Sequence, residues 1–360
     1  SSTSRGLGDV YKRQLLREVN PSSRSDGISE ETIRGSRALS ESKFPDMKVK
    51  RSLTIFCFFW LSYSAWGRPQ KASPERSDLG LKVMEYAPGK SDIRLKTPTH
   101  IAFGPGNREI ITDLKKNRFV FREGPEESFQ VSPVPMRGPH SVVYNPKDKL
   151  YYANDTQNHR MISFADLSKP TIQAQTKKIA GINLHRPHDV VLDPSTGWIY
   201  AINPGSGHVF RFTAIGENES AIKVPLQGYA RALTFTNGKL YAIGSAKGRI
   251  VEIVDWDTPT FKIYDSHDPS GRNGSSGFWA KTGLALNDAE FFEGYWYATS
   301  YFMKQGGAGT DFDENKFIRF KTFDDFNKGK WTDLSDLVPS GITPYYLCLL
   351  YTSPSPRDVE

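Results

Sequence analysis

Two stretches of this chain are near copies of each other: Pro139–Pro146 reads PHSVVYNP, and Pro187–Pro194 reads PHDVVLDP. Each copy is followed by two further short runs rich in β-branched and aromatic residues, at Lys149–Asn154 and Met161–Phe164, and at Gly197–Asn203 and Val209–Phe212. Runs of this composition, separated by turn sequences, predict strands. A repeated unit of several strands decides the architecture before any single residue is considered.

The pattern recurs along the chain. The residues that begin each copy are Pro98, Pro139, Pro187, Ala230, Leu286 and Pro344, at spacings of 41, 48, 43, 56 and 58 residues. A period of this length, with about four strands in each unit, is typical of a β-propeller. We therefore predict an all-β fold, a six-bladed β-propeller. We expect residues 81–96 to supply the strand that closes the ring with the last blade.

The two ends of the chain are related at the level of DNA. Ser4–Gln14 (SRGLGDVYKRQ) and Cys348–Asp358 (CLLYTSPSPRD) can be encoded by one DNA word read in opposite orientations. This resembles a transposase sequencing adapter joined to both ends of a fragment. We expect residues 1–14 and 348–360 to be adapter-derived and exclude them from fold reasoning. The sixth blade is then truncated by a non-native C-terminus, just after it begins.

Residues 47–67 have the pattern of a signal peptide. Met47 is followed by a basic segment, an apolar run from Leu53 to Trp66, and small residues before Arg68. The unbroken apolar stretch is shorter than the roughly 20 residues that a membrane-spanning helix needs, which favours cleavage over a membrane anchor. We expect a secreted or periplasmic protein, with residues 15–46 as a disordered translated leader and residues 68–347 as the propeller.

The composition of residues 68–347 excludes several kinds of chemistry. This segment contains 35 Lys and Arg against 31 Asp and Glu, a net charge of +4, and no cysteine, since Cys57 and Cys348 lie outside it. A disulfide, a thiol nucleophile and a thiolate metal site are therefore excluded. Without a basic run, no nucleic-acid partner is expected. We expect a monomer that makes no membrane contact after signal cleavage.

The repeat predicts which residues line the central channel. In a propeller the first strand of each blade is innermost, so the residue after each anchor should face the axis; these residues are Thr99, His140, His188, Arg231, Asn287 and Tyr345. Imidazole and amide oxygen can ligate a divalent ion, and arginine can bind an anionic group. We predict catalytic roles for His140, His188, Arg231 and Tyr345.

For metal binding we predict His140, His188, Asn287 and Asp288 as ligands. Asp189 and Asp288 each follow a channel residue directly, and either could ligate the ion or orient a ligand. His100 falls one place beyond the channel position and is expected to point into its blade. The alternative interpretation is that channel residues are polar because water fills the channel.

Two segments resemble known propeller families. Asp155, Asn158 and Arg160, in NDTQNHR, resemble the hallmark of NHL repeats, which implies that they stabilise the turn between the second and third strands of a blade. Asn287–Thr299 resembles a segment of the SMP-30/gluconolactonase and paraoxonase-like propellers. That resemblance implies a catalytic calcium ligated by Asn287, more readily than zinc, and the opening of lactones or aryl esters. It implies a small-molecule or carbohydrate-like substrate in the channel, with His140 or His188 as base.

Two other functions stay open. The Pro-His pairs, with Arg231 and Tyr345, also resemble the peptidylglycine amidating lyases, which are zinc-dependent NHL propellers; that function requires a third imidazole near His140 and His188. Alternatively, the chain is a binding scaffold without catalysis, because propellers host many unrelated functions.

Overall fold

The computed structural model describes residues 51–58, 75–76, 81–82, 93–124, 127–226, 229–245, 248–267, 284–303, 310–338 and 343–351. The expected N-terminal adapter and leader, residues 1–46, lie outside the described residues. So do residues 47–50 and 59–67 of the expected signal peptide and residues 352–360 of the expected C-terminal adapter.

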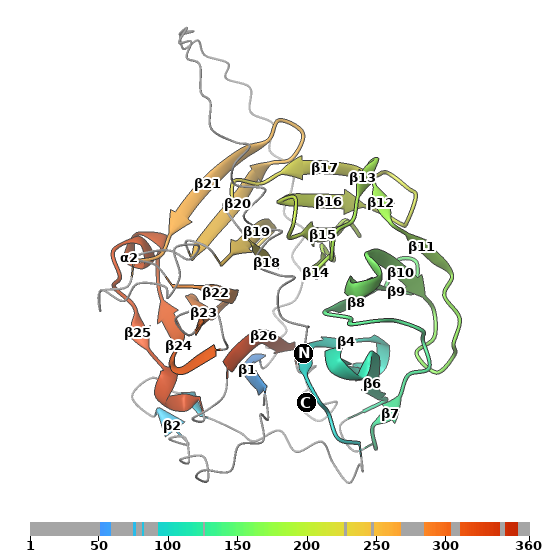
Figure 1. Ribbon diagram of the computed structural model, residues 1–360. Coiled ribbons are helices and arrows are strands. Elements are labelled where there is room, and N and C mark those ends of the chain that lie inside the picture. Colours follow the sequence, from blue (N-terminus) through green and yellow to red (C-terminus); the bar gives the residue numbers. More distant parts are fainter. Residues whose placement is uncertain are drawn as a thin grey trace, which may run out of the picture. The chain divides into compact units, whose positions relative to one another are not determined.

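The described chain is built from five four-stranded antiparallel sheets (Figure 1). The first contains β4 (Pro98–Phe103), β5 (Glu109–Asp113), β6 (Arg118–Arg122) and β7 (Gln130–Val131). The second contains β8 (Val142–Asn145), β9 (Leu150–Asp155), β10 (Arg160–Phe164) and β11 (Ala174–Thr176). The third contains β14 (Asp189–Leu192), β15 (Ile199–Asn203), β16 (His208–Phe212) and β17 (Ser220–Lys223).

The fourth sheet contains β18 (Ala230–Thr236), β19 (Lys239–Gly244), β20 (Arg249–Asp255) and β21 (Thr260–Asp265). The fifth contains β22 (Leu286–Phe292), β23 (Tyr295–Met303), β24 (Thr310–Phe320) and β25 (Thr332–Asp333). Short two-stranded pairs are formed by β2 (Glu75–Arg76) with β3 (Leu81–Lys82), by β12 (Lys178–Ile179) with β13 (Ile182–Asn183), and by β1 (Arg51–Phe58) with β26 (Thr343–Tyr351).

Helices are few in the described chain. One short helix, α2 (Phe323–Asn327), and several single 3-10 turns lie between strands, at Pro105–Asn107, Leu114–Lys116, Thr156–Asn158 and Ser335–Leu337. No helix in the described ranges has the length and apolar character needed to cross a bilayer.

The first strands of the sheets form a ring. In chain order β4, β8, β14, β18 and β22 each contact the next, and β26 contacts both β22 and β4. This is a β-propeller with five four-stranded blades and with β26 in the place of a sixth inner strand. The all-β fold and the strands predicted from the repeat are confirmed. A complete sixth blade and its truncation stay predictions.

The described partner of β26 comes from the N-terminal part of the chain. Residues 83–92 lie outside the described residues, so the expectation that residues 81–96 close the ring stays a prediction. Leu81–Lys82 pairs with β2, and the described partner of β26 is β1, which runs antiparallel to it from Arg51 opposite Tyr351. β1 is the apolar run RSLTIFCF, which supplies backbone partners for the edge of β26. Since β1 lies inside the expected signal peptide, this pairing belongs to the uncleaved chain.

The core lies between neighbouring blades. Between the first two, the rings of Phe119, Tyr151 and Phe164 stack on one another, and all three side chains are fully buried. Between the fourth and fifth, Tyr241 packs edge-on against Trp296 with ring centres 4.8 Å apart. Burying one such side chain contributes about 1.5–3 kcal/mol, so each blade depends on its neighbours for its apolar faces.

Candidate functional site

β-bulges position most of the predicted channel residues. In β22 the pairing with β23 skips from Leu286 to Asp288, which leaves Asn287 as an extra residue. The same irregularity leaves one extra residue in each of three other inner strands: Thr99 in β4, Arg231 in β18 and Tyr345 in β26. A bulged residue is released from the alternation of the strand, and its side chain is re-aimed. The repeat position identified in the sequence is therefore a bulge position.

The two histidines enter from the chain just before their strands. His188 donates its backbone N–H to the carbonyl of Ile202 at 3.1 Å, and Ile202 is also the residue paired with Asp189. His188 and Asp189 therefore share one partner, as the two residues of a bulge do. His140 lies two residues before β8, and its carbonyl accepts a hydrogen bond from the Thr99 hydroxyl at 3.0 Å.

All six predicted channel residues line one cavity. The lining consists of Thr99, His140, His188, Arg231, Asn287 and Tyr345, together with five residues that directly follow a channel residue: His100, Ser141, Asp189, Ala232 and Tyr346. The cavity is small, with a volume of about 20 Å³. That is room for about one water molecule or one ion, so most of any larger ligand has to lie outside it.

Two imidazoles are stacked inside the cavity. The ring centres of His140 and His188 are 4.0 Å apart, with 28° between the ring planes. Burial, with smaller contributions from Arg231, Arg186 and His100, lowers the pKa of His140 to about 3. Burial also lowers the pKa of His188 well below its ordinary value. Both rings are therefore neutral at neutral pH, the form in which imidazole carries a lone pair for a metal or a proton.

A polar chain links Arg231, Tyr345 and His188. The Arg231 guanidinium donates to the Tyr345 hydroxyl at 3.2 Å, and this hydroxyl lies 3.4 Å from His188 Nε2. The Arg231 guanidinium carbon also lies 5.4 Å from the centre of the Tyr345 ring. These three predicted catalytic residues are therefore in contact, although they come from three different inner segments.

His100 was expected to point into its blade, and this prediction is wrong. His100 is buried and lines the same cavity as His140 and His188, with its ring centre 4.3 Å from that of Tyr346. The bulge at Thr99 shifts the alternation of β4 at this point, so the residue after the channel position also reaches the cavity. Burial lowers the pKa of His100 to about 3, so a third neutral imidazole is present.

Asp288 is engaged with backbone groups. Its carboxylate accepts the N–H of Ala289 at 2.9 Å and that of Leu347 in β26 at 2.8 Å, and it lies outside the lining that the described residues form. Asp189 does line the cavity, and it likewise accepts backbone N–H groups, from Val190 at 2.8 Å and from Leu233 in β18 at 2.9 Å. Each aspartate thus ties its strand to the next inner strand.

Several polar atoms in the cavity lining have no hydrogen-bond partner among the described residues, and three of them are potential metal ligands. These three are Nδ1 of His100, Nδ1 of His140 and Oδ1 of Asn287, all buried. The amide nitrogen of Asn287 does have a partner, the carbonyl of Pro344 at 3.2 Å. Buried polar atoms are rarely left without a partner, so these atoms are suited to bind a water molecule or an ion.

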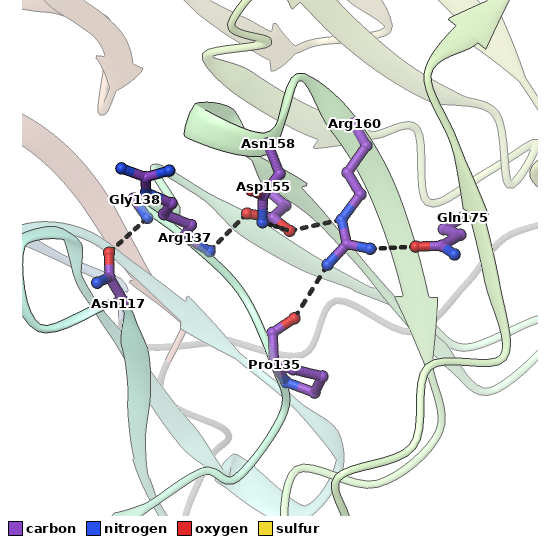
Figure 2. A network of polar contacts seen from close by, with 8 residues as sticks. All are labelled: Asn117, Pro135, Arg137, Gly138, Asp155, Asn158, Arg160 and Gln175. Carbon is purple, nitrogen blue, oxygen red and sulfur yellow. Dashed lines mark hydrogen bonds and ion pairs between the residues drawn. The ribbon is translucent and has the colours of Figure 1, made fainter.

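The Asp155 turn has the structural role implied by the NHL resemblance (Figure 2). The buried Asp155 carboxylate accepts hydrogen bonds from the backbone N–H of Arg137 at 2.6 Å, from Asn158 Nδ2 at 2.8 Å and from Arg160 Nε at 2.6 Å. Arg160 also donates to the carbonyl of Pro135 and to Gln175. The turn between β9 and β10 is thereby fixed to the segment that leads to His140.

A second copy of this turn was missed in the sequence. In the first blade Asp113 accepts the backbone N–H of Thr97 at 3.0 Å and pairs with Arg118 at 3.2 Å. The signal was present, because Asp113 and Arg118 have the same spacing as Asp155 and Arg160. Thr97 stands just ahead of the anchor Pro98, so each turn holds the segment that leads to a channel residue.

Comparisons with known proteins found similarity of structure only. No protein-family model and no curated protein matches the sequence. A chain of a nidogen–laminin complex is similar with a TM-score of 0.49 and 12% identity over 70% of this chain and 84% of that chain. Virginiamycin B lyase from Staphylococcus aureus is similar with a TM-score of 0.45 and 12% identity, over 66% of this chain and 83% of that chain.

Hydrazine synthase of Kuenenia stuttgartiensis is similar with a TM-score of 0.46 and 15% identity, over 71% of this chain and 68% of that chain. Likeness at this level concerns the fold, so the function has to be argued from the residues of this chain. The NHL and SMP-30 assignment stays a prediction.

Proposed function

We propose that this chain is a secreted or periplasmic propeller that binds a divalent metal ion in its central cavity and hydrolyses small lactones or esters. The observation that carries the proposal is the cluster of buried atoms without partners among the described residues: Nδ1 of His100, Nδ1 of His140 and Oδ1 of Asn287. They line one cavity with room for about one ion.

The donor set fits a metal after a small rearrangement. Imidazole nitrogens and an amide oxygen are ordinary ligands, but the lone pairs of two stacked rings do not converge on one point, so His140 or His188 has to rotate. In agreement with this, no three His, Cys, Asp or Glu side chains in the described ranges are arranged to hold an ion. The amide oxygen of Asn287 is therefore part of the proposed set.

The identity of the metal follows from which donors are used. The calcium expected from the SMP-30 resemblance prefers oxygen ligands, of which Asn287 supplies one, whereas three imidazoles in one cavity favour zinc. When bound, either ion would polarise a substrate carbonyl and stabilise negative charge on its oxygen.

The protein's own groups have separate roles in this proposal. A pKa of about 3 makes His140 a poor base at neutral pH, which favours a ligand role for it. Arg231 and Tyr345 bind and orient the substrate at the mouth of the cavity, since the cavity itself is too small for a lactone ring. His188 lies next to the Tyr345 hydroxyl, and burial lowers its pKa as well, so it too is assigned a ligand role and not the role of the base.

Metal content of the chain, purified without chelator, tests the proposal. We expect about one calcium or zinc ion per chain by elemental analysis, lost in His140→Ala and in Asn287→Ala. His267→Ala, which removes an exposed imidazole, is the matched control and should keep the ion. The same four proteins are then assayed on lactones and aryl esters. Absence of metal from the parent, with both variants folded like the parent, contradicts the proposal.

A binding scaffold without catalysis is the second candidate. The stacking of His140 on His188 favours the scaffold, because the two rings pack face to face and their nitrogen atoms do not point at a common ion. A zinc-dependent lyase is the third, and the position of His100 beside the other two imidazoles favours it. Zinc content together with a product that contains a new double bond would select the lyase, and turnover that adds water would select the hydrolase.

Secretion is tested separately by N-terminal sequencing of the exported protein. We expect the mature chain to begin at Arg68, directly after Ala65–Gly67. A mature chain that retains the apolar run beginning at Leu53 contradicts cleavage and favours an anchored protein.

A further inference from the structure

One wall of the cavity presents a fixed guanidinium. The guanidinium carbon of Arg231 lies 5.3 Å from the ring centre of Tyr229 and 5.4 Å from that of Tyr345. The hydrogen bond from Arg231 to the Tyr345 hydroxyl fixes its orientation further. An arginine held between aromatic rings is pre-organised for a planar anion, because its donors match a carboxylate in geometry.

Negative charge in the cavity lining is limited to one side chain. Asp189 is the single acidic residue among the described residues that line the cavity, and both its oxygens accept backbone N–H groups. The one carboxylate of the described lining is therefore turned to backbone donors, and the guanidinium of Arg231 is the group of that lining suited to an anionic ligand.

We propose that the ligand of this cavity is an organic carboxylate, held at its carboxylate end by Arg231 and extending out of the cavity. The small space inside admits an oxygen of such a group but not a ring. This inference rests on the proposed function in placing the ligand at the channel, and it does not depend on the metal. It also applies if the chain is a binding scaffold.

Thermal unfolding of the full chain with sodium benzoate, and with neutral benzamide at equal ionic strength, tests the inference. We expect Tm to rise with benzoate concentration and to stay unchanged with benzamide, because a ligand that binds only the folded state raises Tm. Arg231→Gln should weaken benzoate binding at least about tenfold, as expected for loss of a charge-assisted pair. Arg211→Gln is the matched control, since Arg211 lies between Trp198 and Trp256 away from the cavity and should keep the shift.

The inference would be overturned by the absence of a shift with benzoate, by an equal shift with benzamide, or by a shift that Arg231→Gln retains. A repeat with chelator separates the two proposals. A benzoate shift that survives chelation assigns the carboxylate to Arg231, whatever the metal analysis shows. A shift that chelation abolishes assigns the carboxylate to a bound metal, which contradicts the arginine site and supports the metal centre.

Discussion

Asp189 and Asp288 are candidate metal ligands in the sequence, and in the structure their carboxylates form hydrogen bonds between neighbouring inner strands. Each follows a channel residue, and each directs one carboxylate oxygen to a backbone N–H of the next inner strand, at Leu233 and Leu347. Burial is the main reason that the pKa of Asp189 is raised to about 7 and that of Asp288 to about 8. Both aspartates therefore titrate near neutral pH.

These shifts predict how stability depends on pH. The folded-state pKa values of about 7 and about 8 lie above the unfolded value of about 3.9, so the contribution of the aspartates is complete at low pH and is lost as pH rises through 7 to 8. His100 and His140, with pKa values lowered by burial to about 3, act oppositely and lose their contribution as pH falls below about 6.5.

We therefore expect the free energy of unfolding, measured with urea, to be greater at about pH 6.5 than at about pH 8.5, by up to about 1.4 kcal/mol per proton and pH unit. Asp189→Asn should flatten this slope, because an amide does not titrate. Asp166→Asn, at a turn where hydrogen bonds from Ser168 lower the pKa of Asp166, should leave it unchanged. A chain that is more stable at the higher pH would refute this account.

The Asp155 turn gives a second prediction for a single residue. Asp155→Ala removes a fully buried carboxylate and leaves its three hydrogen-bond donors without an acceptor. We therefore expect the free energy of unfolding to fall by about 3 kcal/mol. Asp257→Ala removes a carboxylate that is 85% exposed and pairs with Arg211, and its effect should stay below about 0.5 kcal/mol. Urea unfolding of both variants makes the comparison, and similar losses would show that the turn does not stabilise its blade.

In the bulged inner strands, a residue that packs in the core is followed directly by a residue that faces the cavity. Leu286 and Asn287 are adjacent in β22, but the first is fully buried in the core between blades and the second faces the cavity. We expect Leu286→Ala to lower the free energy of unfolding by about 2–5 kcal/mol. Asn287→Ala, which loses one hydrogen bond to Pro344, should lower it by about 1 kcal/mol or less. An equal loss in urea unfolding would mean that the bulged residue also supports the fold.

The sequence predicted the strands well because turn residues and apolar runs are local signals. Expected runs such as Met161–Phe164 coincide with strand β10 within a residue. The bulges explain the errors near the axis. A strict alternation turns His100 away from the channel, whereas one extra residue in β4 brings it to the cavity. The roles of Asp189 and Asp288 depend on the distance to the next blade, which no local pattern encodes.

For the whole molecule, the repeat spacing predicted a propeller and brought six distant residues to one cavity. The partner of β26 was not predictable in the same way. The described partner is the run Arg51–Phe58, which lies outside the repeat and which no local pattern marked as a partner for this strand. Sequence patterns do not predict the metal or the substrate, because the binding of either in this small cavity depends on how the side chains rotate.

Contact between whole blades gives a last prediction. A Cβ at Gly248 would lie 2.0 Å from the carbonyl oxygen of Leu284, which leads into the next blade, and φ at Gly248 is +56°. Gly238 has a similar φ of +71° but open space around it. Gly248→Ala should therefore lower Tm clearly more than Gly238→Ala, since only the first adds a clash to the backbone strain. Equal shifts would indicate that the two blades can move apart at little cost.

The bulges beneath the channel residues have a consequence for how this protein can change. A bulged residue of these strands faces the cavity and not the core between blades, so its side chain can be exchanged while the core contacts of its strand stay in place. The side chains at the bulge positions can therefore vary while the strands around them keep their packing. These positions are Thr99, Arg231, Asn287 and Tyr345. New ligand preferences could evolve, or be engineered, by exchanging these side chains one at a time while the blades keep the same packing.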